Sequence, residues 1–313
     1  MTGYLVRRLL ATIPVMMVVA VVVFSLIHLA PGDPAAIIAG DNVTAKQIAE
    51  IRERLGLEEP LWKQFALWVG NLAKGDLGTS IFSRKSVTEL IVQRAEPTIA
   101  LTATTLVVAI TLAITAGVLA AWKAGTWIDR GVMIFAVMGY SVPVFVVGYG
   151  LVYVFSMQLK WLPVQGYAPI ADGLVPFIRH LILPSVALGL AYVALIARIT
   201  RTSMLEVLSE DYIRTADAKG VATRPKLMRH ALKNAAVPIA TVIGIGVALL
   251  IGGVVITETV FNIPGIGRLT VDAILKRDYP IIQGIILIFS AWYVLINLAV
   301  DVLYTFLDPR IRY

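Results

Sequence analysis

Long apolar runs alternate with shorter polar segments along the whole chain. Six of these runs reach the roughly 20 residues that a helix needs to cross a bilayer. They cover residues 9–30, 98–122, 131–157, 180–199, 235–257 and 281–303. The pattern therefore predicts an all-α integral membrane protein with six transmembrane helices.

The first apolar run follows two basic residues, Arg7 and Arg8. A cleavable signal peptide is the alternative interpretation, but the apolar core of such a peptide spans only about 7 to 15 residues. The run here is nearer to about 20 residues, as a membrane span requires. We interpret it as the first membrane helix, with the N-terminus inside.

A polar segment, residues 31–97, separates the first two runs and predicts a small extracytoplasmic helical subdomain. Proline and glycine at residues 31–34 break the first helix, and helical signals follow at residues 44–55 and 60–72. The last of these carries an apolar stripe at helical spacing, formed by Trp62, Phe65, Leu67, Trp68 and Leu72. Packing is the favoured interpretation of this stripe, and substrate contact is the alternative.

The polar segment 209–238 lies between the fourth and fifth runs and carries signals for two helices. Ser209 is predicted to cap the first helix, with Glu210 and Asp211 at the positive end of its dipole. Lys219 falls in its last turn and Gly220 just beyond, a position that glycine favours. The first helix is therefore predicted to span residues 209–219.

The second helix of this segment is predicted to start from Thr223 as N-cap, with Pro225 in its first turn. Basic residues predominate from the end of the fourth run onward: Arg198, Arg201, Arg214, Lys219, Arg224, Lys226, Arg229 and Lys233, against Glu206, Glu210, Asp211 and Asp217. By the positive-inside rule this loop is cytoplasmic.

Small and weakly polar residues in the third and fifth runs are candidates for lining a pathway. They are Tyr140, Ser141, Pro143, Gly244, Gly246 and Gly252. Close helix contact is an equally good interpretation, since small residues let membrane helices approach one another.

The composition agrees with a membrane protein, since 58% of the residues are hydrophobic and 15% are charged, with a mean hydropathy of +0.82. The net charge of +7 would also suit a nucleic-acid partner. However, the basic residues cluster at the ends of apolar spans, so topology explains them and no nucleic-acid partner is expected. The absence of cysteine excludes disulfides, thiolate metal sites and a cysteine nucleophile.

Several separated stretches carry a resemblance to a known family. They are PGDPA (31–35), LGLEEPLW (55–62), GDLGTSIFSRKSV (75–87), YIRTADAKG (212–220), ETVFNIPGIGR (258–268) and RDYP (277–280). The chain resembles the permease subunits of binding-protein-dependent ABC importers, in the dipeptide, oligopeptide and nickel permease family, of the dipeptide permease B type. In the family's cytoplasmic motif a Glu-Ala-Ala triplet precedes a glycine. Here Arg214, Thr215 and Ala216 take the triplet's places before Gly220.

The resemblance implies a division of the chain and a coupling site. The regions are residues 1–30 as an N-terminal transmembrane helix, 31–97 as the extracytoplasmic subdomain, and 98–313 as a permease core with five transmembrane helices and a cytoplasmic coupling loop at 200–235. The residues expected to couple to an ATPase are Glu210, Asp211, Tyr212, Arg214, Thr215, Ala216, Asp217, Lys219 and Gly220.

The resemblance also implies partners: a second homologous permease subunit, one or two ABC ATPase subunits and an extracytoplasmic substrate-binding protein. ATP and Mg are expected on the ATPases and no cofactor on this chain, which has no GxxxxGK[ST] phosphate loop and is not expected to be an enzyme. The middles of the six spans lack Asp, Glu, Lys and Arg, which argues against an ion-driven carrier. His28, His180 and His230 form no metal-binding pair.

Function and location follow as expectations from the resemblance. The chain is expected to form half of a peptide pathway in a bacterial inner membrane, with both termini cytoplasmic. Glutathione, a nickel chelate or an oligosaccharide remains an alternative solute. A gated channel and a membrane scaffold are the alternatives of a different class.

Overall fold

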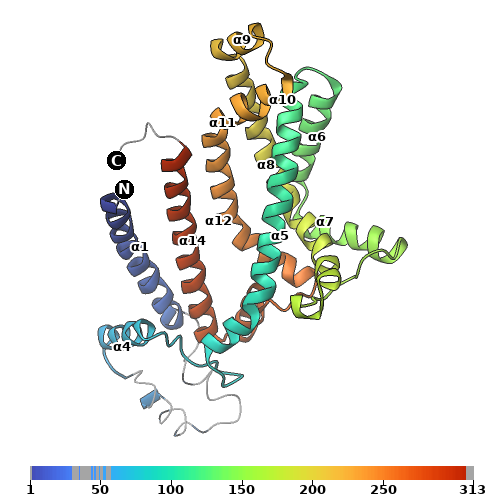
Figure 1. Cartoon of the computed structure of the whole chain (residues 1–313). Coiled ribbons are helices and arrows are strands. Elements are labelled where there is room, and N and C mark those ends of the chain that lie inside the picture. Colours follow the sequence, from blue (N-terminus) through green and yellow to red (C-terminus); the bar gives the residue numbers. More distant parts are fainter. Residues whose placement is uncertain are drawn as a thin grey trace. The chain divides into compact units, whose positions relative to one another are not determined.

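The computed structural model describes residues 2–29, 35, 44, 46, 49, 52, 53 and 58–307, and its described secondary structure is helical (Figure 1). The main helices are α1 (Thr2–Leu29), α4 (Leu61–Ala73), α5 (Val87–Trp122), α6 (Trp127–Ser141), α7 (Val144–Leu151), α8 (Leu174–Leu208), α9 (Asp211–Ala218), α12 (Ala236–Val260), α13 (Ile266–Lys276) and α14 (Tyr279–Leu307). The predicted helical signal at residues 44–55, the break at 31–34 and the C-terminal segment 308–313 fall wholly or largely outside the described residues.

The predicted set of membrane spans is confirmed. Five helices are long and apolar enough to cross a membrane, and α6 with the segment 144–158 forms a bent pair that makes a sixth. The second span begins earlier than predicted, because α5 starts at Val87 and continues through Pro97. Proline breaks a helix less severely when neighbouring groups satisfy the backbone that it frees.

The third span is not the continuous helix that its apolar pattern predicts. Its two parts meet at an angle of 106° at Pro143. Proline disfavours helical geometry in the preceding residue, and Val142 is extended, with φ −90° and ψ 126°. The second part continues from α7 into a π-helical turn at Val152–Gln158.

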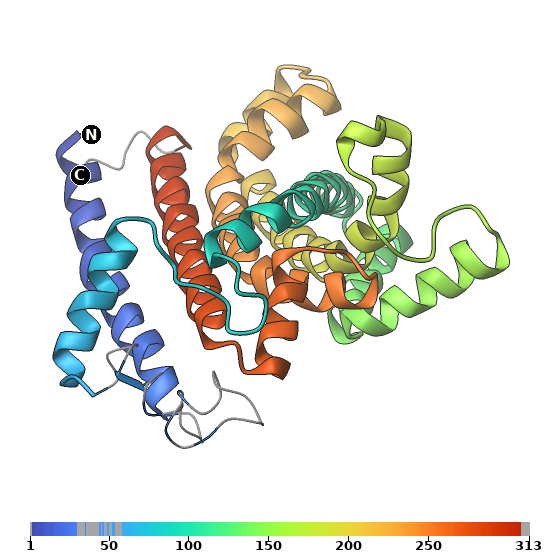
Figure 2. The ribbon, with the colours of Figure 1, turned by 90° about the horizontal axis from the view of Figure 1, so that it is seen from below.

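The chain divides into two compact units. The first contains residues 1–95 and 269–294. In this unit α4 packs on α1, as Figures 1 and 2 show. The apolar stripe on α4 provides the contact: the ring of Phe24 lies 5.3 Å from that of Phe65 and 5.7 Å from that of Trp68, measured between centroids. Packing is therefore the role of this side of the stripe, while Trp62 is 73% exposed.

The second unit contains residues 96–268 and 295–313. Helix α8 forms its centre, since it contacts α6, α7 and α12. Leu181, Leu188, Leu250 and Val254 belong to its main hydrophobic cluster. The turn between α5 and α6 and the segment from α9 to α11 lie at the same end of this unit, at the top of Figure 1. This end carries the predicted coupling loop.

Candidate functional site

Helix α9 is held in place by one buried side chain, that of Ile213. This isoleucine is 2% exposed and belongs to a cluster that also contains Met204 of α8, Leu227 and Ala231 of the next segment, and Ile239 of α12. Full burial of an isoleucine side chain contributes about 1.5–3 kcal/mol. The short helix is thus attached to the ends of two membrane spans at once.

Two polar contacts join α9 to the segment that follows it. The side-chain amide of Asn234 donates to the Tyr212 hydroxyl at 2.8 Å. Lys226 Nζ lies 2.6 Å from Asp217 Oδ1. This following segment comprises α10 (Thr223–Pro225), a π-helical stretch at Lys226–Ala231 and α11 (Leu232–Asn234). These contacts hold α9 against this following segment, which is the second half of the coupling loop.

Gly220 ends α9 as the sequence predicts. Its φ is +75°, a left-handed conformation that glycine adopts without steric cost. Gly220 N donates to Asp217 O at 2.9 Å and Val221 N donates to Ala216 O at 3.1 Å. This pair of hydrogen bonds is the Schellman ending of a helix.

The start of α9 differs from the prediction. Ser209 is not its N-cap, because this serine ends α8 and its hydroxyl donates to Glu206 O at 2.7 Å. Glu210 occupies the N-cap position without a side-chain cap hydrogen bond. Thr223 is likewise the first residue of α10 and not its cap, which is Ala222. In both places the predicted N-cap residue is one position away from the residue that occupies the N-cap.

The residues predicted for coupling fall on both sides of α9. Ala216 is half-buried, whereas the exposed ones are Glu210, Asp211, Tyr212, Arg214, Thr215, Asp217, Lys219 and Gly220. Arg214 pairs with Asp211 at 3.3 Å, and both side chains are largely exposed. The free face of α9 therefore presents a cation, an anion and small side chains.

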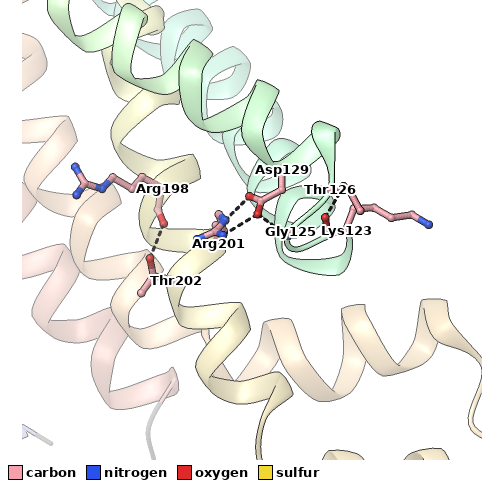
Figure 3. A network of polar contacts seen from close by, with 7 residues as sticks. All are labelled: Lys123, Gly125, Thr126, Asp129, Arg198, Arg201 and Thr202. Carbon is pink, nitrogen blue, oxygen red and sulfur yellow. Dashed lines mark hydrogen bonds and ion pairs between the residues drawn. The ribbon is translucent and has the colours of Figure 1, made fainter.

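A buried ion pair near this loop was missed by the sequence analysis. Arg201 of α8 donates from Nε to Asp129 Oδ1 at 2.5 Å and from Nη2 to Asp129 Oδ2 at 2.8 Å. Gly125 N donates to the same Oδ2 at 3.0 Å, as Figure 3 shows. Asp129 has a side chain only 6% exposed. Arg201 is 72 residues away from Asp129 in the sequence, so no local pattern indicated this ion pair.

The arrangement fixes the start of α6 to the end of α8 that leads into α9. Charge-assisted, two-pronged hydrogen bonds between a guanidinium and a carboxylate define both distance and orientation. Arg198, one turn earlier on α8, points away from this contact (Figure 3) and is exposed. Arg201 is therefore the arginine of α8 that ties it to α6.

The predicted pathway residues of the third span lie at its bend. Tyr140 is 72% exposed, the Ser141 hydroxyl donates to Val137 O at 2.8 Å, and Pro143 begins the second part of the span. These three candidates for pathway lining therefore lie beside a bend that the apolar pattern did not predict.

The predicted pathway glycines of α12 lie in two kinds of place. Gly244 packs against the side chain of Val300, and a Cβ on Gly246 would lie 3.2 Å from Tyr192 Cδ1. Gly252 is exposed and has no atom within 4 Å of the position of a Cβ. Within this chain the first two therefore serve helix contact, while Gly252 faces outward.

A second buried acidic residue, Glu258, was predicted to lie outside the fifth span but belongs to α12. The helix continues to Val260, and Glu258 is 0% exposed. Its Oε1 accepts from the Thr98 hydroxyl at 2.6 Å and its Oε2 accepts from Arg268 N at 2.9 Å. The Thr98 hydroxyl oxygen also accepts from Ile266 N at 2.8 Å. We call this group the Glu258 cradle.

Another acidic residue of α5, Glu96, holds the loop that follows the bent span. The Tyr167 hydroxyl donates to Glu96 Oε1 at 3.0 Å, and Ile170 N donates to the same atom at 3.3 Å. Burial, together with this hydrogen bond, raises the pKa of the Tyr167 hydroxyl. Both hydrogen bonds tie this loop to α5.

Within the described residues, no three His, Cys, Asp or Glu side chains gather as metal ligands would. His180 Nδ1 lies 2.8 Å from Pro176 O, and the His28 ring lies 4.9 Å from that of Phe24 at a tilt of 54°.

Comparisons with known proteins agree with this arrangement. Residues 113–313 match the family described as binding-protein-dependent transport system inner membrane component, and residues 1–102 match its N-terminal family. The chain is 57% identical over 310 residues to the probable peptide ABC transporter permease protein y4tP of Sinorhizobium fredii (strain NBRC 101917 / NGR234), covering 99% of each chain. It is 46% identical over 313 residues to the glutathione transport system permease protein GsiC of Escherichia coli (strain K12), covering 100% of each.

Solved structures show the same fold at low sequence identity. The inward-facing MetNI methionine ABC transporter matches with a TM-score of 0.58 and 17% identity, over 70% of this chain and 96% of that chain. An amino acid ABC transporter matches with a TM-score of 0.51 and 16% identity, over 72% and 95%. The chain thus belongs to the family of binding-protein-dependent transport system inner membrane components, and it is a non-catalytic permease subunit of an ABC importer.

Proposed function

We propose that this chain forms half of a peptide translocation pathway and that α9 is the element through which a partner ATPase moves it. The observation that carries this proposal is the Ile213 cluster, which joins α9 to α8 and α12. A partner that displaces α9 on hydrolysing ATP would displace the ends of both spans with it. Packed elements move as rigid bodies between discrete arrangements, because close-packed contacts do not deform continuously.

The proposed assembly contains a second homologous permease subunit, one or two ATPase subunits that hold ATP and Mg, and an extracytoplasmic binding protein. This chain would sit in a bacterial inner membrane with both termini and α9 on the cytoplasmic side. The excess of Lys and Arg around α9 supports this orientation. The pathway would run along the interface of the two permeases, where Tyr140, Ser141, Pro143 and Gly252 are candidates for lining it.

Peptides are the proposed solute class, since the relative with 57% identity is named a probable peptide permease. Glutathione, itself a short peptide, is the second candidate, because the glutathione permease relatives are 46% identical. ATPase activity of the assembly in lipid, with its binding protein loaded in turn with short peptides and with glutathione, distinguishes the two. Solute flux that needs neither ATP nor a binding protein would contradict both candidates.

Two substitutions in the loop test the role of α9. Gly220→Pro forces φ to about −65° where the chain needs a positive value, and Ala216→Arg puts a long charged side chain at a half-buried position. We expect both to abolish ATP-driven uptake while the chain still inserts in the membrane. Ala171→Arg, at an exposed position between the third and fourth spans, is the matched control and should transport normally.

Normal uptake by both loop variants would refute the role of α9. Membrane insertion is checked by extraction of folded chain in mild detergent. Co-purification of the ATPase then separates loss of docking from loss of movement: a variant that retains the ATPase but does not transport has lost the transmission step.

A further inference from the structure

A groove of ≈ 490 Å³ lies between the C-terminal end of α5 and the second half of the coupling loop. Its α5 wall includes Ile114, Val118 and Trp122, and its loop wall includes Arg224 and Met228. Figure 1 shows α10 beside this end of α5. The groove is distinct from the exposed face of α9 to which we assign the ATPase.

The α5 wall is an apolar strip on a membrane span. Ile114, Val118 and Trp122 are four residues apart and so lie one above another on the helix. Together they extend about 12 Å along the axis, at 1.5 Å per residue. An apolar strip of this length on a bilayer-spanning helix suits an acyl chain lying along it.

The end of this strip coincides with the polar boundary of the span. No charged residue occurs between Glu96 and Lys123, so Lys123 marks the level at which α5 leaves the apolar layer. Its ammonium group lies 4.1 Å from the centroid of the Trp122 ring, and Trp122 is 47% exposed. Tryptophan favours the headgroup level of a bilayer because its ring is apolar and its N–H is polar.

The opposite wall offers a cation at the same mouth. Arg224 is exposed and has no ion-pair partner among the residues that the structure describes, in contrast to the nearby Lys226, which pairs with Asp217. A guanidinium binds a phosphate through two parallel hydrogen bonds. Arg224 lines the groove, and Lys123 follows Trp122, which also lines it. Their positive charge suits an anionic lipid headgroup.

We propose that this groove binds one anionic phospholipid of the bilayer, with an acyl chain along Ile114 and Val118 and the phosphate between Lys123 and Arg224. The lipid would fill the space between α5 and the loop that carries α9. Anionic lipid would therefore brace the coupling loop, and its removal would loosen α10 from α5.

Contact of lipid with Trp122 is the direct test. The full assembly is reconstituted in phosphatidylcholine vesicles containing either brominated phosphatidylglycerol or brominated phosphatidylcholine, since bromine quenches tryptophan fluorescence on contact. The difference between the native chain and Trp122→Phe isolates the signal of this tryptophan from the other five of the six in the chain. We expect brominated phosphatidylglycerol to quench it at several times lower lipid fraction than brominated phosphatidylcholine.

Arg224→Gln supplies the specificity test, and Arg229→Gln is its matched control, because Arg229 is exposed on the same segment and does not line the groove. One basic residue near an anionic surface contributes roughly fivefold in affinity. Arg224→Gln should therefore weaken the preference for phosphatidylglycerol by roughly fivefold, and Arg229→Gln should leave it unchanged.

Native mass spectrometry of the purified assembly provides a second measurement that does not need Trp122→Phe to fold. Retention of one phosphatidylglycerol by the native chain and by Arg229→Gln, but not by Arg224→Gln, supports the proposal. Equal quenching by both lipids, equal behaviour of the two arginine variants, or shielding of Trp122 from both lipids by a partner subunit would each overturn it.

Discussion

The second unit buries an acidic side chain near each end, and the two are held in different ways. Asp129 accepts two hydrogen bonds from a guanidinium and one from a backbone amide. Glu258 accepts one hydrogen bond from the Thr98 hydroxyl of α5 and one from the backbone amide of Arg268, in the segment after α12. Thr98 lies on α5, and about 36 Å of this helix separates it from the end at Trp122, beside the turn that carries Gly125.

The difference between the two sites follows from what each must hold together. The ion pair joins two helices, α6 and α8, whose side chains supply both partners. The Glu258 cradle instead folds the irregular segment after α12 around the carboxylate, so that a Cβ on Gly265 would clash with the Glu258 carboxylate. Charge pairing thus stabilises the end beside the coupling loop, while the other end uses backbone donors and glycine.

Loss of Arg201 should have the largest effect. Arg201→Ala leaves the Asp129 carboxylate buried without its guanidinium, and removing one partner of a buried ion pair typically costs about 3–5 kcal/mol. We expect a loss of free energy of unfolding in this range, near its lower end because the Arg201 side chain is 26% exposed. Chemical denaturation of the chain in detergent measures it.

The control for this prediction is Arg198→Ala, which removes an exposed arginine one turn away and should change stability little. The double variant Asp129→Asn with Arg201→Ala should recover part of the loss, because the unpaired charge is gone. If Arg201→Ala were no less stable than Arg198→Ala, the ion pair would have no structural role.

Loss of the Thr98 hydroxyl should have a smaller effect. Thr98→Val keeps the shape of the side chain but removes the donor to Glu258 Oε1 and the acceptor for Ile266 N. A buried polar group left without its partner costs about 1–3 kcal/mol, which is our expected loss of free energy of unfolding. Thr98→Ser retains the hydroxyl and should lose less. Equal losses would mean that the methyl group, not the hydroxyl, matters at this position.

The two ends also show which structural features can be predicted from the sequence. The apolar runs predicted the spans because their length is fixed by bilayer thickness, and Gly220 predicted the end of α9 because positive φ favours glycine. The contacts of the two buried carboxylates were not predicted. Asp129 meets Arg201, and Glu258 meets Thr98, only because helices that are distant in sequence pack together. The bend at Pro143 was missed because its apolar pattern continues across it.

The coupling residues were predicted from the family resemblance together with local helix signals. The anchor Ile213 was not among them, because a single isoleucine in a polar helix gives no periodic pattern. Its role depends on Met204, Leu227 and Ile239, which come from three other segments. A lone apolar residue within a short polar helix is nevertheless the signal that would have found it.

The exposed pair between Asp217 and Lys226 gives the smallest expected effect and shows whether burial distinguishes the Asp129 pair. Its N–O distance of 2.6 Å is similar, but the Asp217 side chain is 51% exposed. Exposed ion pairs contribute about 0–1 kcal/mol and weaken with salt. We expect Asp217→Asn to lower the free energy of unfolding by at most about 1 kcal/mol, with the difference shrinking in high salt. The loss in Arg201→Ala should persist in the same salt, because the Asp129 side chain is only 6% exposed and buried pairs are screened much less. If salt reduced both losses equally, the Asp129 pair would be behaving as a surface contact, and the distinction between the two ends of the unit would fail.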